Sequence, residues 1–214
     1  MKTLDRKRII IVDYGAGNLR SVANAIARLG YQPVVTASPS EVMAARAVIF
    51  PGVGAAADTM QSLKKTGLDE AIYRLIYERR PLFAVCIGMQ VLFSETEEGG
   101  GHKCLGLLTG KVRRLPPGQK IPHIGWNQVK QRLAHPIFDG IPDESNFYFV
   151  HSYYPSPADA SVVAGTTDYG VSMCSLLIKE SLVATQFHPE KSGEAGLKLY
   201  ANFLKLATEK AVLD

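Results

Sequence analysis

Short apolar runs alternate with amphipathic stretches through the first 95 residues. The apolar runs are rich in β-branched residues, which is typical of buried strands, and we expect strands at Arg8–Val12, Pro33–Thr36, Ala47–Phe50 and Leu82–Val85. Apolar residues at helical spacing predict a helix from an Asn18 N-cap to Gly30, and further helices within Ala55–Lys65, Leu68–Arg79 and Gly88–Ser94. Strand–helix alternation predicts an α/β fold whose mostly parallel sheet has helices on both faces.

The pattern changes after about residue 105, where short strands follow one another with few helical residues between them. These are expected at Lys111–Leu115, Asn127–Lys130, Asn146–Val150, Val162–Thr166, Met173–Ile178 and Leu182–Phe187. They predict a smaller antiparallel portion, followed by a final amphipathic helix over Ser192–Lys210. No internal repeat or linker interrupts the chain, so we expect one domain over residues 1–214.

Composition narrows the class of protein. The 214 residues are 46% hydrophobic and carry a net charge of +4 without a basic stripe, which argues against nucleic-acid binding. The apolar stretch Ile9–Val12 is too short for a signal peptide or a membrane span. Three cysteines do not form a disulfide framework, and they fit a reducing compartment. We therefore expect a cytoplasmic protein.

Cys86 ends the strand Leu82–Val85, and Gly88 follows two residues later at the predicted start of a helix. This strand–turn–helix context is that of a nucleophile elbow with cysteine in place of serine. Such a turn places the sulfur at a helix N-terminus, which favours the thiolate, and points the Ile87 N–H at a substrate carbonyl. On this stretch alone, a buried structural cysteine is an equally good interpretation.

A second motif, His188-Pro189-Glu190, follows the predicted strand Leu182–Phe187. Pro189 fixes the backbone between the two polar residues, so that the imidazole can face a thiol while the carboxylate holds its other nitrogen. Alone, the tripeptide is as typical of an ordinary loop. Together with Cys86 it predicts a catalytic triad.

A third motif, Pro51-Gly52-Val53-Gly54, follows the predicted strand Ala47–Phe50. Its glycines allow the backbone to approach a ligand closely and to present N–H groups to it. Gly52 and Val53 are therefore candidates for the second donor of an oxyanion hole. An ordinary glycine turn is the alternative.

These three motifs, in this order, resemble the class I (triad) glutamine amidotransferases over essentially the whole chain. Within that family, Asp13–Asn18, Pro122–Asn127 and His151–Tyr153 are similar to the glutaminase subunits of imidazole glycerol phosphate synthase. The Pro-His-x-Gly-Trp-Asn stretch is the most diagnostic of these. The resemblance implies the family's three-layer, flavodoxin-like fold. Ala84 departs from the pattern, because glycine is more usual there.

The resemblance also implies the roles of individual residues. Glutamine would be hydrolysed through a thioester on Cys86, with His188 moving the protons and Glu190 orienting the imidazole. Ile87, Gly52 and Val53 would form the oxyanion hole. Glutamine would be held by the residues at the family's substrate positions, which are Gly52, Gln90, Glu98, Ser152 and Tyr153. The family uses no cofactor and no metal.

A partner is implied as well. In the family, ammonia passes within a heterodimer to a (β/α)8-barrel cyclase subunit. That subunit converts a phosphoribulosyl-formimino aminoimidazole carboxamide ribotide (PRFAR) to imidazole glycerol phosphate and AICAR in histidine biosynthesis. We expect Asn18, Trp126 and Lys191, from loops near the predicted site, to contribute to the docking face. A core position for Trp126 and a solvated Lys191 are the alternatives.

Three other functions compete with this interpretation. The same chemistry could feed a different synthase, the chain could be a related cysteine hydrolase, or it could be a non-catalytic module that keeps the fold. The Gly15-Ala16-Gly17 loop argues little for a dinucleotide site, because Arg20 stands where that fingerprint wants a small residue. His102 and Cys104 are not accompanied by a second pair of ligands, which a four-coordinate zinc site needs. The role of His123 is open.

Overall fold

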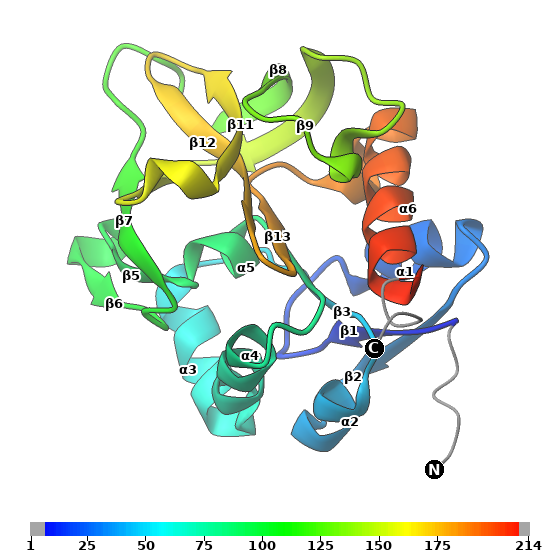
Figure 1. The fold of residues 1–214 in the computed structure, drawn as a ribbon. Coiled ribbons are helices and arrows are strands. Elements are labelled where there is room, and N and C mark those ends of the chain that lie inside the picture. Colours follow the sequence, from blue (N-terminus) through cyan, green and yellow to red (C-terminus); the bar gives the residue numbers. More distant parts are fainter. Residues whose placement is uncertain (1–6, 210–214) are drawn as a thin grey trace.

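The computed structural model describes residues 7–209, and a nine-stranded mixed sheet runs through it (Figure 1). In spatial order the strands are β2 (Gln32–Thr36), β1 (Arg8–Val12), β3 (Val48–Phe50), β4 (Leu82–Val85), β13 (Leu182–Thr185), β12 (Ser172–Lys179), β11 (Val163–Asp168), β8 (His123–Gln131) and β9 (Ser145–His151). The first five strands pair in parallel, and the remaining pairs are antiparallel. Most of the strands predicted after residue 105 therefore belong to the same sheet as the parallel strands.

Helices cover both faces of the parallel half (Figure 1). They are α1 (Leu19–Arg28), α2 (Pro39–Ala44), α3 (Ala56–Thr66), α4 (Leu68–Tyr77) and α6 (Gly193–Glu209). Successive residues of β1 point to opposite faces, as strand geometry requires. Ile9 and Ile11 pack into the core under α1 and α6, whereas Ile10 and Val12 pack into the core under α2, α3 and α4. This arrangement gives the expected three layers.

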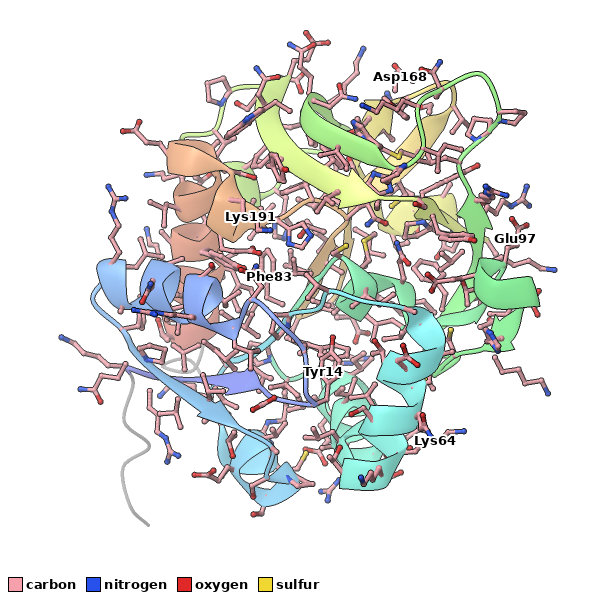
Figure 2. All side chains as sticks on the ribbon, turned by 180° about the vertical axis from the view of Figure 1, so that it is seen from behind. Tyr14, Lys64, Phe83, Glu97, Asp168 and Lys191 are labelled. Carbon is pink, nitrogen blue, oxygen red and sulfur yellow. The ribbon has the colours of Figure 1, made fainter. Side chains whose placement is uncertain are left out.

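Aromatic residues fill the layer between the sheet and α6. The ring of Phe83 lies 5.0 Å from that of Tyr200 and 5.2 Å from that of Phe203, measured between centroids, and Figure 2 shows Phe83 in the interior. All three residues are almost completely buried. Burying each of these side chains stabilises the fold by about 2–3 kcal/mol. The contacts fix α6 against β4, which carries Cys86 at its end.

A smaller four-stranded sheet lies beside the main one. Its strands, in order, are β10 (Tyr153–Pro157), β7 (Leu108–Arg114), β5 (Phe93–Thr96) and β6 (His102–Lys103). Between residues 7 and 209, no helix is long and apolar enough to span a bilayer.

Several predicted elements need correction. The helix expected over Gly88–Ser94 is only the single turn α5 (Ile87–Gln90), because the chain turns into β5 at Phe93. Helix α2 and strands β5, β6 and β10 were not predicted. The final helix begins at Gly193, and Lys210 lies outside the described residues. The other strands and helices match the prediction to within a few residues at each end.

Candidate active site

Four loops meet at one edge of the parallel sheet. They follow the carboxyl ends of β1, β3, β4 and β13, which are adjacent in the sheet. In open parallel sheets this edge is the usual place for a ligand. The loops carry the Asp13–Asn18 segment, the Pro51–Gly54 loop, Cys86 and the His188–Glu190 segment.

Cys86 occupies the elbow that the sequence predicts. Its backbone lies at φ 53° and ψ −110°, a conformation that non-glycine residues rarely adopt and that occurs at functional sites. The Cys86 N–H donates to Thr185 O at 2.7 Å and so holds the turn against β13. A Cβ at Gly88 would lie 2.5 Å from Phe50 O, so the tight turn excludes any side chain there. Because α5 is one turn long, its dipole adds less to thiolate stability than the sequence suggested.

His188 and Glu190 form a buried pair. His188 Nδ1 lies 2.8 Å from Glu190 Oε1, and both side chains are only 1% exposed. The backbone around His188 is also fixed, since its N–H donates to Tyr148 O and its carbonyl accepts from Ser192 Oγ. With Nδ1 held by the carboxylate, Nε2 is the nitrogen left to exchange a proton with a thiol.

Two further side chains hold the Glu190 carboxylate. Asn18 Nδ2 donates to Oε1 at 2.7 Å, and Tyr200 Oη donates to Oε2 at 3.4 Å. Burial raises the pKa of Tyr200 well above its usual range, so the phenol stays protonated and can only stabilise the carboxylate. Asn18 makes no side-chain cap on α1, contrary to the N-cap prediction, because its amide is turned toward Glu190.

The electrostatics favour a charged imidazole. Burial alone would lower the pKa of His188, but a Cys86 thiolate and the Glu190 carboxylate together outweigh burial and raise it to about 10. The Glu190 carboxylate therefore favours the imidazolium that forms when His188 takes a proton from the thiol. The geometry and the charges fit a Cys–His–Glu nucleophilic site.

A cavity of about 300 Å³ lies over Cys86 and His188. Most of the residues predicted to contact the substrate line it, namely Val53, Ile87, Gln90, Glu98, Ser152 and Tyr153. Gly54 lines the cavity, whereas the predicted contact residue Gly52 does not; an added Cβ at Gly52 would be 2.0 Å from Ile87 Cγ2. The volume suits a ligand of amino-acid size.

Glu98 is the acidic residue that reaches this cavity among the three neighbouring glutamates. Its Oε2 accepts from the N–H of Ala56, at the start of α3, at 2.6 Å. Glu95 instead pairs with Lys111, and Glu97 accepts from the N–H of Arg114. Glu98 therefore connects the cavity wall to the helix that follows the glycine loop.

The residues predicted for a docking face differ in their surroundings. Trp126 lies in strand β8 and not in the predicted loop, because residues 123–129 pair with β9. It is 58% exposed, so the alternative of a core position is wrong, and the nearby Ile124 is 57% exposed. The Lys191 ammonium lies 5.9 Å from the centroid of the Tyr148 ring, and Figure 2 labels this lysine. The role of these residues in docking stays a prediction.

Three polar residues near the nucleophile carried no role in the sequence interpretation. Gln186 is completely buried beside Cys86, and His123 and His151 are buried against each other. Gln186 directly follows the apolar, buried strand β13, and this was the available signal for it; β8 and β9, which carry His123 and His151, are of mixed polarity and gave none. Their contacts with one another depend on strand pairing that the sequence does not show.

The other cysteines are poor candidates for chemistry. Burial raises the pKa of Cys104 to about 11 and that of Cys174 to about 12, so both are thiols at neutral pH. Within residues 7–209 no group of three or more His, Cys, Asp or Glu side chains could hold a metal ion.

Known proteins support the same assignment. The glutamine amidotransferase class-I family model matches residues 10–207. The imidazole glycerol phosphate synthase subunit HisH of Dehalococcoides mccartyi (strain CBDB1) is 63% identical over 93% of this chain and 97% of its own length. The HisH subunit of Chloroflexus aurantiacus (strain ATCC 29364 / DSM 637 / Y-400-fl) is 49% identical over 92% of this chain and 95% of its own.

Solved structures share the fold at low sequence identity. A crystal structure of a glutamine amidotransferase superposes with a TM-score of 0.70 at 21% identity, covering 92% of this chain and 98% of that one. The structure of PurLQS from Thermotoga maritima gives a TM-score of 0.73 at 18% identity, covering 93% and 98%. The chain belongs to the class-I glutamine amidotransferase family, in the group of imidazole glycerol phosphate synthase HisH subunits.

Proposed function

We propose that this chain is the glutaminase subunit of an imidazole glycerol phosphate synthase and acts in the cytoplasm. It hydrolyses glutamine to glutamate and ammonia, and the ammonia passes to a (β/α)8-barrel cyclase partner that uses it on PRFAR. The observation that carries the proposal is the shared cavity: Cys86 at a strained elbow and His188, held by Glu190, line the same space of about 300 Å³.

The first half of the reaction forms a thioester. His188 Nε2 takes the proton of Cys86, and the thiolate attacks the side-chain carbonyl carbon of glutamine. The carbonyl oxygen becomes an oxyanion, which accepts hydrogen bonds from the N–H of Ile87 and from the Gly52–Val53 peptide. When the C–N bond breaks, the imidazolium returns its proton to the departing nitrogen, which leaves as ammonia.

The second half regenerates the enzyme. Water, deprotonated by neutral His188, attacks the thioester carbonyl, and the same donors hold the second oxyanion. The C–S bond then breaks, its electron pair returns to Cys86 Sγ, and glutamate is released. Glu190 orients the imidazole and stabilises the imidazolium that forms in both halves. Gln90, Glu98, Ser152 and Tyr153 hold the substrate from the cavity wall.

The partner docks on the exposed face of strand β8. Ile124 and Trp126 present apolar side chains there, and the Trp126 ring meets that of Tyr148 edge-on at 6.0 Å. A large exposed aromatic residue is a typical interface anchor. Lys191, over the same Tyr148 ring, supplies a cation for a carboxylate of the partner, and the Asn18 loop adds to this face.

The proposal is tested by reconstitution with the cyclase. Glutamine-dependent formation of imidazole glycerol phosphate is expected for the wild type and is lost in Cys86→Ala, while free ammonium still supports the reaction in that variant. Full glutamine-dependent activity of Cys86→Ala would contradict the proposal. Ammonia release that feeds a different synthase, and not the cyclase, would contradict the partner assignment alone.

A further inference from the structure

Gln186 is a buried side chain in direct contact with the nucleophile. It is 0% exposed, follows β13 and lies two residues before His188. Its Nε2 donates to Cys86 Sγ at 3.4 Å. Such a donor can stabilise a thiolate. It does so only if the amide nitrogen faces the sulfur, because the amide oxygen can only accept.

The neighbouring contacts fix that orientation. The Tyr153 carbonyl can only accept, so the Gln90 group 2.8 Å from it must be the amide nitrogen. The second N–H of that nitrogen points to Gln186 Oε1 at 2.9 Å. With its oxygen engaged by Gln90, Gln186 turns its nitrogen toward Cys86. Both Gln90 N–H groups are thereby used, which leaves Oε1 as the atom of Gln90 available to a substrate ammonium.

A pair of histidines extends the same chain of donors. His151 Nδ1 lies 3.0 Å from the Tyr153 carbonyl and must carry a proton, so its Nε2 is an acceptor. His123 Nδ1, at 3.1 Å, therefore donates to that nitrogen. His123 Nε2 is then left to accept from Asn127 Nδ2 at 3.4 Å, and every tautomer in the chain is determined.

Both imidazoles stay neutral, as this series of hydrogen bonds requires. Burial lowers the pKa of His151 to about 3, and the charges of His123 and His188 add to this effect while the Tyr153 carbonyl opposes it. Burial also lowers the pKa of His123, whose ring is stacked on Tyr169 with centroids 3.8 Å apart. The tautomers are therefore stable at neutral pH.

We propose that Gln186 is a catalytic residue whose amide N–H stabilises the Cys86 thiolate, and that Gln90 and His151 are positioning residues that fix its orientation. This inference rests on the proposed function for its chemical meaning. The donor stabilises the thiolate that attacks the substrate. It also stabilises the sulfur again when the C–S bond of the thioester breaks and the electron pair returns to it.

The test measures the reactivity of Cys86 in the chain without a partner. Alkylation by iodoacetamide is followed against pH by mass spectrometry of the Cys86 peptide. Gln186→Leu is expected to move the midpoint of the profile upward by about 1 pH unit, the size of a lost hydrogen bond to a charged group. Gln186→Glu moves it further, because a carboxylate repels the thiolate. The exposed Gln61→Leu and Gln61→Glu are the matched controls and leave the midpoint unchanged.

A second pair of variants tests positioning. His151→Leu removes the donor to the Tyr153 carbonyl and is expected to raise the midpoint by less than Gln186→Leu does. His151→Asn keeps a donor near the position of Nδ1 and restores the wild-type midpoint. In the reconstituted synthase, Gln186→Leu lowers glutaminase kcat about tenfold with little change in KM, in line with the 1-unit shift.

An unchanged alkylation profile in both Gln186 variants, even with a lowered melting temperature, would overturn the inference and leave Gln186 a purely structural residue. If Gln186→Leu does not fold, Gln186→Glu and the His151 pair carry the test. Alkylation needs neither glutamine nor the cyclase. The result can therefore be interpreted even if the proposed partner is wrong.

Discussion

Gly196 lies on α6, outside the cavity, yet the geometry predicts that Gly196→Ala disables the site. A Cβ at Gly196 would be 2.0 Å from Pro189 O and 2.8 Å from Ser192 Cβ. Pro189 joins His188 to Glu190, and Ser192 binds the His188 carbonyl. The added methyl group therefore pushes directly on the backbone that holds the histidine.

The magnitude follows from the overlap. Real Cβ contacts are essentially never under 3.0 Å, so the 2.0 Å approach requires a separation of at least 1.0 Å between α6 and Pro189. A displacement of this size at a catalytic group costs about 100-fold in rate, or about 2.7 kcal/mol of transition-state stabilisation. Overpacking costs about 1–3 kcal/mol of folding stability, offset by about 1 kcal/mol of helix propensity. Activity therefore falls more than stability.

The assay is glutaminase kcat/KM in the reconstituted synthase, measured beside urea unfolding of the isolated chain. Gly196→Ala is expected to lose about 100-fold in kcat/KM and no more than about 2 kcal/mol in unfolding free energy. Lys205→Ala, at an exposed position of the same helix, controls for the effect of a new alanine in α6. Wild-type kcat/KM in Gly196→Ala would refute the argument that α6 sets the His188–Glu190 geometry.

Four further predictions concern the contacts around the site. Glu190→Gln removes a charge that raises the pKa of His188, so that pKa, measured by NMR titration, falls below its wild-type value of about 10. Folding raises the pKa of His188 from 6.5 to about 10, so the stability that His188 contributes is complete below pH 6.5 and is lost as pH rises toward 10. Urea unfolding of the wild type and of His188→Gln across this pH range checks the direction of the change in unfolding free energy. Asn18→Ala loses about 2–3 kcal/mol of unfolding free energy, and Asn18→Gly recovers about 1 kcal/mol of it, because Asn18 has φ 70°. Equal losses in the two Asn18 variants would rule out backbone strain as a contributor. Gly88→Ala lowers the unfolding free energy by about 1–3 kcal/mol through its clash with Phe50 O, and unchanged stability in a urea titration would contradict that.

The parallel half of the fold could be predicted because its strands are continuous apolar runs. Strand β1, with residues 9–12 fully buried, is the clearest case. The antiparallel strand β10 was missed because two prolines obscure it, although edge strands tolerate proline. Helix α2 has an N-cap signal in its sequence, since Ser38 precedes Glu41 by three residues and its side chain accepts from the Glu41 N–H.

The candidate site divides in the same way. Cys86 and His188 could be predicted because each sits in a local motif whose geometry the sequence determines. The contact of Gln186 with Cys86 joins residues 100 positions apart, and that of Asn18 with Glu190 joins residues 172 apart. These depend on which strands are neighbours, and no local pattern reports that.

The central claim is that Cys86 forms a covalent intermediate with glutamine. The most direct measurement is mass spectrometry of the reconstituted synthase after incubation with glutamine and an acid quench. We predict a glutamyl thioester on the peptide that contains Cys86, and none in Cys86→Ser. An adduct on Cys104 or Cys174, or glutamine hydrolysis that survives in Cys86→Ser, would contradict the account.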